Sequence, residues 1–298
     1  MLAFEIARIG ICTQGCGVQL SPGEAYRSFL VTNANRTDAT IQLRVRLGQA
    51  PKLDFRQPCF QSDGVWDLYD GGDDGYLIVV SPPSLRHRPK CVVSLRRDIS
   101  DGEILFCQEP SLDNGSSSFS PSQQAVLEPL AHPFDQLIFA GYLAQGRGTI
   151  LHACGVVDEG RGFLFCGVSG AGKSTMANIW KPTYATLLSD DRIIVRRMDG
   201  VFRMYGTPWH GDANVCDPGN APLEKVFFIV HADRNYAKPI SPIDAASRLL
   251  VRCFPPFWDK EGMEFVTNFL AEMAEEVPCY ELGFVPDQSV VEFVRSIE

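Results

Sequence analysis

The stretch Gly-Val-Ser-Gly-Ala-Gly-Lys-Ser at residues 167–174 restricts the fold of this chain more than any other feature. It satisfies the pattern G-x-x-x-x-G-K-[ST] and follows an apolar run at residues 163–166. A short helix is expected to begin at Lys173 and to end before Pro182. Glycines let consecutive backbone N–H groups point at one anion, and the positive end of the helix dipole is directed to the same place. This order of strand, loop and helix predicts an α/β domain that binds a nucleoside triphosphate. A glycine-rich loop that arose by chance would not be expected to have a strand before it and a helix after it.

Two acids downstream extend this prediction from binding to chemistry. Lys173 supplies a charge for the outer phosphates, and Ser174 supplies a hydroxyl ligand for Mg²⁺. Asp190 and Asp191 follow an apolar segment, 17 and 18 residues after Lys173. Phosphoryl transfer needs a metal partner and a group that positions the acceptor, and this pair can supply both. Ser174 and Asp190 are the candidate metal ligands, although the sequence leaves open which acid binds the metal and whether one merely caps a turn. The predicted nucleotide-binding residues are Gly167, Ser169, Gly170, Ala171, Gly172, Lys173, Ser174 and Thr175.

His152 lies 21 residues before Lys173, in an apolar run that the tight turn at residues 158–162 separates from the run before the loop. This pattern predicts a hairpin that brings His152 beside the phosphate loop, where it either joins the site or remains a core residue. The chain carries neither an LSGGQ-like signature nor an N-K-x-D guanine-reading motif. These absences argue against transporter-type ATPases and GTPases.

Charge and apolar content exclude several other classes of function. The net charge is −9, which opposes binding to nucleic acid or anionic lipid. The one small basic cluster, Arg192, Arg196 and Arg197 with Arg203, is either a solvated strand edge or a set of phosphate contacts. No apolar stretch approaches about 20 residues, and the N-terminus lacks a basic head, so we expect a cytoplasmic protein without a membrane partner. The ten cysteines fit that compartment as reduced thiols.

The chain is expected to form two domains. Residues 1–107 show short alternating runs separated by turns, which predicts a mainly β domain. Residues 109–124 are rich in serine, proline and glycine and read as a linker, so we predict domains at 1–120 and 121–298. In the second half we expect further strands and helices at 134–145, 243–254, 261–276 and 287–298.

His152, the loop GVSGAGKS and the segment LLSDD, in this order and at these spacings, resemble the bacterial HPr kinase/phosphorylase family, and most closely its broader HPr-kinase-like group. The resemblance covers roughly residues 135–298. It implies a P-loop kinase domain of the phosphoenolpyruvate carboxykinase type that uses ATP and Mg²⁺. Carried over by position, Lys173 is the phosphate-binding lysine and Ser174 the Mg²⁺-binding hydroxyl. Asp191 is the general base toward an acceptor serine, His152 the active-site histidine, and Asp190 a neighbour that orients water, metal or Asp191.

Several segments depart from that family. Thr175 stands where the family has a glutamate, and residues 205–220 and 251–262 replace its E-x-R-G-x-G-I and P-G-R-N segments. The departures leave open both HPr as the substrate and any phosphorylase activity. The replacements carry Trp209, His210 and Arg252, which we interpret as acceptor-binding residues on exposed loops. The alternative is that they pack the edge of the domain.

The sequence therefore predicts an ATP-dependent kinase acting on a hydroxyl, most simply a serine, of a protein or peptide such as a ribosomally made precursor peptide. The mainly β domain would recruit or shield this partner. A small-molecule kinase on the same scaffold and a non-catalytic ATP-binding regulatory module remain the alternatives. The oligomeric state stays open, and a homo-oligomer is compatible with the sequence.

Overall fold

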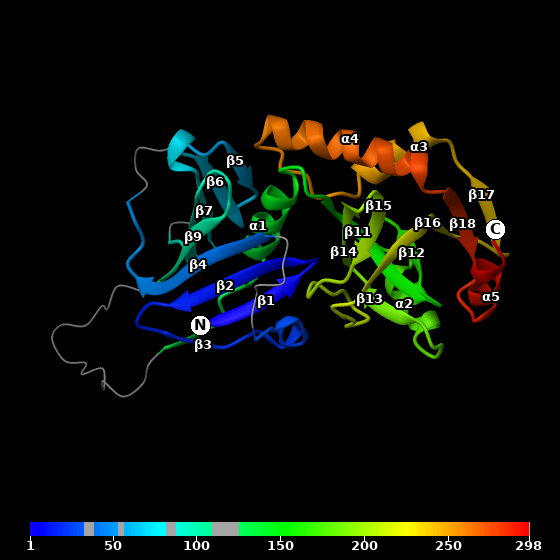
Figure 1. The fold of residues 1–298 in the computed structure, drawn as a ribbon, viewed down its shortest axis with the longest axis horizontal. Coiled ribbons are helices and arrows are strands. Elements are labelled where there is room, and N and C mark those ends of the chain that lie inside the picture. The colour runs from blue at the N-terminus through cyan, green and yellow to red at the C-terminus, as the bar shows by residue number, and fades with distance from the viewer. Residues whose placement is uncertain (33–38, 53–56, 82–87, 109–124, 298) are drawn as a thin grey trace. The chain divides into compact units, whose positions relative to one another are not determined.

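The computed structural model describes residues 1–32, 39–52, 57–81, 88–108 and 125–297 (Figure 1). The chain divides into two compact units, Met1–Ile138 and Phe139–Glu298. Each unit contains a large β-sheet, so the chain has a mixed α/β fold, as the sequence predicts. Among the described residues, no helix has the length and apolar character required to cross a membrane.

The N-terminal unit is built on an eight-stranded sheet in the order β1-β2-β4-β9-β8-β7-β6-β5. The strand β4 pairs in parallel with β2 and β9, and the other neighbours are antiparallel. The mainly β character expected of this half is confirmed. The strands are β1 (Leu2–Ile6), β2 (Ile9–Gly15), β4 (Ala39–Gly48), β5 (Phe60–Ser62), β6 (Trp66–Asp70), β7 (Tyr76–Val80), β8 (Cys91–Leu95) and β9 (Asp101–Cys107), with 3-10 turns at Glu24–Phe29 and Gly72–Asp74.

Residues after 124 belong to the N-terminal unit up to Ile138, so the units divide later than the sequence-based boundary at residue 120. The reason is long-range pairing. Strand β10 (Val126–Leu127) pairs in parallel with β3 (Gln19–Leu20), and the Tyr26 hydroxyl donates to the buried Asp135 carboxylate at 2.5 Å. The expected linker at 109–124 lies outside the described residues.

The C-terminal unit holds the second sheet, in the order β12-β11-β14-β15-β16-β18-β17. Strand β12 pairs antiparallel with β11 and parallel with β16, and β13 pairs antiparallel with β11. Strands β12 and β13 therefore run in the same direction and end at the same edge. The strands are β11 (Thr149–Asp158), β12 (Arg161–Cys166), β13 (Thr186–Ser189), β14 (Arg192–Met198), β15 (Val201–Tyr205), β16 (Asn220–His231), β17 (Tyr236–Pro239) and β18 (Cys279–Phe284), and the helices are α2 (Lys173–Trp180), α3 (Pro242–Leu250), α4 (Lys260–Glu276) and α5 (Ser289–Ser296). The division between the units falls within helix α1 (Phe134–Leu143).

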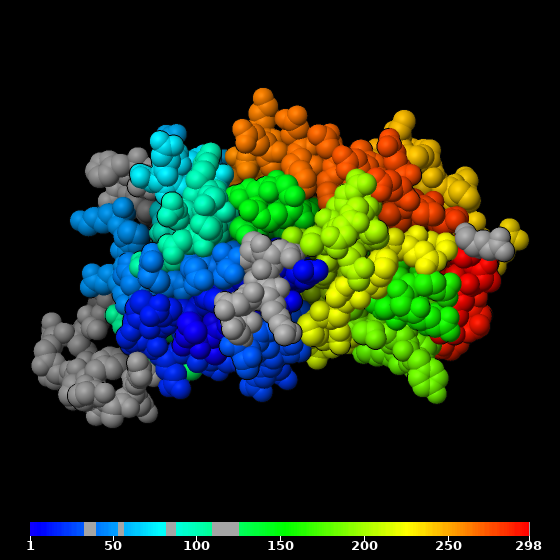
Figure 2. Space-filling view, viewed as in Figure 1, coloured from blue at the N-terminus to red at the C-terminus, as the bar shows by residue number. Residues whose placement is uncertain are grey.

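Both faces of this sheet are covered by helices. Leu164 and Cys166 of β12 pack in one buried cluster with α3 and α4, whereas Phe163 and Phe165 pack in a second cluster with α2 and α5. Helices α3 and α4 lie on one side of the sheet in Figure 1, and α4 reaches the surface of the unit (Figure 2, orange). Burial on both faces explains why these strands read as continuous apolar runs rather than as alternating ones.

The local elements around the glycine-rich loop match their sequence prediction. Strands β11 and β12 form the expected hairpin, with Glu159 and Gly160 in the left-handed region at its turn. Helix α2 begins at Lys173 and ends at Trp180, before Pro182. The helix predicted at 243–254 is shorter, because α3 ends at Leu250 and the chain then turns toward β11.

Candidate active site at the glycine-rich loop

The loop between β12 and α2 forms one wall of a cavity of about 310 Å³. Gly170 and Gly172 adopt positive φ angles of 80° and 101°, which glycine adopts without strain. Gly172 also caps α2 without a side-chain hydrogen bond, so the first-turn N–H groups remain available to a ligand. The cavity is lined by Ser169, Gly170, Gly172, Lys173, Ser174 and Thr175 of the loop, with His152, Asp190, Asp191, Gly211 and Asp212. The predicted catalytic residues and most of the predicted nucleotide-binding residues therefore line one cavity.

Gly167 and Ala171 shape the loop without lining the cavity. A Cβ at Gly167 would meet the Ala171 Cβ at 2.8 Å, so the close approach of these two residues requires glycine at position 167. Lys173 is buried, with 7% of its surface exposed, and its Nζ donates to the carbonyls of Gly167 at 3.1 Å and Val168 at 3.3 Å. Burial lowers the pKa of the Lys173 ammonium, although the nearby Asp191 carboxylate opposes this shift.

Asp190 is the buried acid of the pair, with 1% of its surface exposed. Its Oδ1 accepts from the Gly211 N–H at 2.9 Å, and its Oδ2 accepts from the Ala213 N–H at 2.8 Å and from the Ser174 hydroxyl at 3.1 Å. Asp190 thus joins the phosphate loop to the segment at 206–213. Gly211 is required here, because a Cβ would lie 2.8 Å from Asp190 Oδ2.

Asp191 is the accessible acid, and its carboxylate lies between the side chains of His152 and Arg192. Its Oδ1 is 3.0 Å from His152 Nε2, and its Oδ2 is 2.5 Å from Arg192 Nη1. Burial opposes ionisation of Asp191, but the hydrogen bond from His152 and the positive charges nearby outweigh it, so its pKa lies below the ordinary value. The Arg192 guanidinium in turn stacks over the Phe254 ring at 4.1 Å. The site therefore presents an ionised carboxylate held on both oxygens.

The oxygen atoms of Ser174 and Asp190 fit the ligand set of Mg²⁺. The hydroxyl and carboxylate oxygens are 3.1 Å apart at the mouth of the loop. Mg²⁺ is usually bound by one or two protein oxygens with phosphate and water completing the octahedron. No group of three or more His, Cys, Asp and Glu suited to a metal occurs in the part of the chain that the structure describes.

None of the three expected acceptor-binding residues lines this cavity, and two of them are not exposed. The sequence predicts Trp209 on an exposed loop, but the residue is 6% exposed and its ring packs edge-on against Phe139, with ring centroids 5.3 Å apart. Arg252 is half-buried over the Phe228 ring and donates to the Arg248 carbonyl. His210 alone is exposed, at the turn before Gly211. The interpretation of Trp209 as an exposed residue is therefore wrong, and Arg252 makes packing contacts.

The basic cluster is divided between different environments. Arg196 is buried and donates to the Arg147 carbonyl, Arg197 pairs with Glu272 and Glu276, and Arg203 donates to Asn220. Only Arg192 contacts the site.

Sequence reasoning missed the structural part played by Ser189. The Ser189 hydroxyl donates to the Trp209 carbonyl at 2.7 Å and accepts from the N–H groups of Asp191 and Arg192. It thus fixes the turn that carries both acids. A weak signal was available in the sequence, because a serine hydroxyl can accept from the backbone N–H two residues further on.

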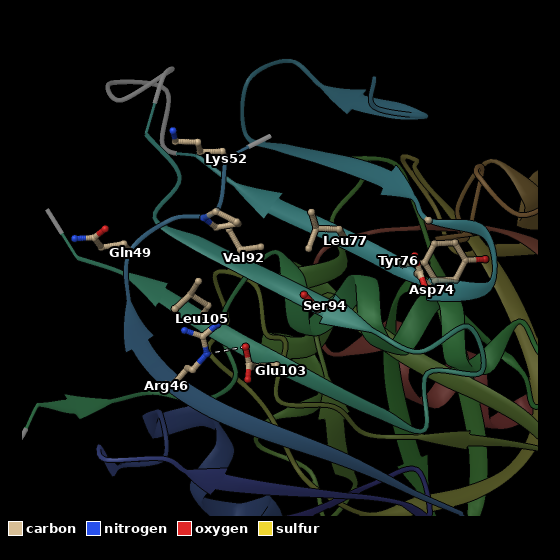
Figure 3. Close-up of a pocket in the computed structure, with 13 residues that line it drawn as sticks. Arg46, Gln49, Lys52, Asp74, Tyr76, Leu77, Val92, Ser94, Glu103 and Leu105 are labelled. Atoms are coloured by element: carbon tan, nitrogen blue, oxygen red, sulfur yellow. Dashed lines mark hydrogen bonds and ion pairs between the residues drawn. The ribbon is translucent and has the colours of Figure 1, made fainter. Parts of the chain in front are cut away.

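A second cavity, of about 470 Å³, lies on the sheet of the N-terminal unit. Figure 3 shows Arg46, Gln49 and Lys52 at one end, Asp74 and Tyr76 at the other, and Leu77, Val92 and Leu105 among the residues between them. Arg46 and Glu103 form an ion pair of 2.7 Å within it. This cavity combines charged ends with an apolar floor.

Comparison with known proteins gives little further information. No family model and no curated protein matches the chain. Among solved structures, the HPr(Ser) kinase/phosphatase from Coxiella burnetii is similar over 49% of this chain and 86% of that chain, with 13% identity and a TM-score of 0.28. A similarity at this TM-score establishes neither fold nor activity, so the function of this chain has to be inferred from its own residues.

Proposed function

We propose that the chain is an ATP-dependent kinase that transfers the γ-phosphoryl group to a hydroxyl, most simply a serine, of a protein or peptide. One observation carries the proposal. A single cavity holds Lys173 and Ser174 of a glycine-rich loop and, facing the same space, an ionised carboxylate that His152 orients. A nucleotide-binding regulatory module needs the loop but has no use for an oriented carboxylate.

The donor phosphates bind to the N–H groups of the loop and of the first turn of α2. Lys173 Nζ, which otherwise bonds the Gly167 and Val168 carbonyls, is close enough to exchange those bonds for phosphate oxygens. Ser174 and Asp190 would hold Mg²⁺. When bound, Mg²⁺ neutralises charge on the β- and γ-phosphates.

The acceptor hydroxyl binds to Asp191. The oxygen of the acceptor hydroxyl forms a bond to the γ-phosphorus. The bond from that phosphorus to the β–γ bridging oxygen breaks, and ADP leaves with the electron pair. The hydroxyl proton passes to an Asp191 oxygen. Because the transition state is loose, the main contribution of Asp191 is to align the hydroxyl, which suits a carboxylate with a lowered pKa. His152 and Arg192 fix the carboxylate for this task.

The acceptor is proposed to be a peptide segment because of the cavity in the N-terminal unit. Arg46 and Lys52 lie toward one end, where Glu103 pairs with Arg46, and Asp74 lies at the other; these charges, with apolar side chains between them, suit an extended segment with charges of both signs (Figure 3). In this proposal the mainly β domain recruits the peptide through this cavity, whereas a small-molecule kinase would not require it.

The test incubates the full chain with labelled ATP, Mg²⁺ and a degenerate library of serine-containing peptides. Asp191→Asn is expected to lower transfer by about 10²- to 10⁴-fold and to leave ATP binding unchanged. Glu264→Gln, at an exposed position of α4, is the matched control and is expected to transfer at the wild-type rate. Equal transfer by wild type and Asp191→Asn would remove Asp191 from this role. Faster transfer to free serine, sugars or nucleosides than to peptides would favour the small-molecule alternative.

A further inference from the structure

His231 is an exposed aromatic residue at the end of β16 that has no part in the chemistry described above. Its ring lies on the ring of Phe284, with centroids 5.8 Å apart and planes 30° from parallel. Phe284 is fully buried at the end of β18. The imidazole is therefore a flat surface with a fixed support beneath it and solvent on its other side.

The same ring borders the glycine-rich loop. His231 Nε2 lies 3.4 Å from the Gly170 carbonyl oxygen. A Cβ at Gly172 would come within 3.0 Å of Phe284 Cζ and 3.5 Å of His231 Cε1, so both rings touch the backbone of a residue that lines the cavity. His231 therefore lies next to the loop, beside the cavity and not among the residues that line it.

Strand order places His231 on the side of the loop opposite the catalytic groups. Strand β12, which leads into the loop, lies between β11 and β16. His152 comes from β11, and both acids follow β13, which pairs with β11. His231 comes from β16. A nucleotide that points its terminal phosphate at Asp191 must direct its other end toward β16, since ligands of such sheets lie across the carboxyl ends of the strands.

We propose that His231, supported by Phe284, is the stacking platform for the base of the bound nucleoside triphosphate. The proposal rests on the kinase function proposed above, because that function sets which end of the nucleotide faces Asp191. An aromatic ring binds a base through its face, so the platform takes purines without reading their hydrogen-bonding edges. Adenine and guanine nucleotides are therefore expected to bind similarly.

The experiment measures calorimetric binding of a non-hydrolysable ATP analogue and of inorganic tripolyphosphate, both with Mg²⁺, to the full chain. Tripolyphosphate contacts the loop but has no base. His231→Ala is expected to weaken binding of the ATP analogue by about 5- to 100-fold, the range that loss of one stacked base contact gives, and to leave tripolyphosphate binding within about twofold. His231→Phe retains a ring and is expected to bind the analogue within about threefold of wild type.

Three results would overturn the proposal. The first is equal weakening of both ligands by His231→Ala, which would mean that His231 contacts phosphate or supports the loop. The second is equal loss with His231→Phe and His231→Ala, which would assign the effect to the contact with the Gly170 carbonyl. The third is unchanged binding of the analogue by His231→Ala. Failure of the wild type to bind either ligand would instead overturn the kinase function and this proposal with it.

Discussion

The substitution Asp190→Asn is expected to lower the stability of the fold, because the buried Asp190 carboxylate holds several hydrogen-bond donors in place. The Asp190 carboxylate accepts three hydrogen bonds, from the N–H groups of Gly211 and Ala213 and from the Ser174 hydroxyl. An asparagine offers one carbonyl oxygen and one NH₂ group. Whichever way the amide is turned, one backbone N–H then faces an NH₂ donor and loses its acceptor.

The size of the effect follows from burial. Asp190 is 1% exposed, so water cannot replace the lost acceptor. A buried donor left without a partner costs about 1–3 kcal/mol, and replacing a charged acceptor weakens the remaining bonds further. We therefore expect the free energy of unfolding of the C-terminal unit to fall by about 2–4 kcal/mol. For a unit of this size each 1 kcal/mol corresponds to a shift in Tm of about 2–4 °C, which gives a decrease of about 4–16 °C.

The assay is thermal unfolding of the full chain followed by circular dichroism, without nucleotide. Asp212→Asn is the matched control, because Asp212 is an exposed acid on the same cavity and is expected to change stability by less than about 0.5 kcal/mol. The reasoning is refuted if Asp190→Asn unfolds at the temperature of the wild type, or if Asp212→Asn lowers it by the same amount.

Three further predictions concern other parts of the C-terminal unit. The pKa of Asp191 is lowered in the folded chain, so its ionised form stabilises the fold above the unfolded pKa of about 3.9. This contribution is lost as the pH falls through the lower pKa of the folded chain. In urea unfolding, the difference in stability between wild type and Asp191→Asn should therefore be present at pH 7 and should shrink toward pH 3. Trp209→Ala removes a buried ring and should cost about 3–5 kcal/mol in urea unfolding, whereas His210→Ala should change stability by less than about 0.5 kcal/mol; similar effects of the two would contradict the burial of Trp209. Arg295→Met removes both hydrogen bonds to the buried Asp158 and should lower the free energy of unfolding by about 1–3 kcal/mol, with Arg161 at 3.8 Å limiting the loss; a decrease under 0.5 kcal/mol would contradict it.

The sequence predicts the parts of the site that depend on neighbouring residues. The hairpin from β11 to β12, the left-handed glycines of the loop and the start of α2 at Lys173 are encoded within about 25 residues of one another. The same stretch contains His152 and the loop, so their proximity follows from the hairpin alone. Short-range periodicity and turn residues are sufficient for such elements.

The parts that the sequence does not predict depend on contacts between distant segments. Glycines around Trp209 suggest an exposed loop, but Gly206 serves close packing, since a Cβ there would meet the Asp217 carbonyl oxygen at 1.8 Å. The segment folds back over Asp190 and buries the Trp209 ring. The sequence likewise does not distinguish Arg192 from the other basic residues of its strand, Arg196 and Arg197. The pairing of β14 with β11 places Arg192 opposite His152, so that Arg192 contacts the site.

Asp190 and Asp191 are adjacent in the chain, and their different surroundings are what the proposed phosphoryl transfer requires. Both acids lie in the bend between β13 and β14 that the Ser189 hydroxyl fixes, and their two carboxylates face different surroundings. Here one carboxylate turns inward to Ser174 and the segment at 206–213, and the other turns to His152 and Arg192. Because the first is tied to the phosphate loop and the second to β11, a change in the loop moves the candidate metal ligand relative to the candidate base. Loss of the Ser174 hydroxyl should therefore disturb the distance between donor and acceptor as well as the binding of Mg²⁺.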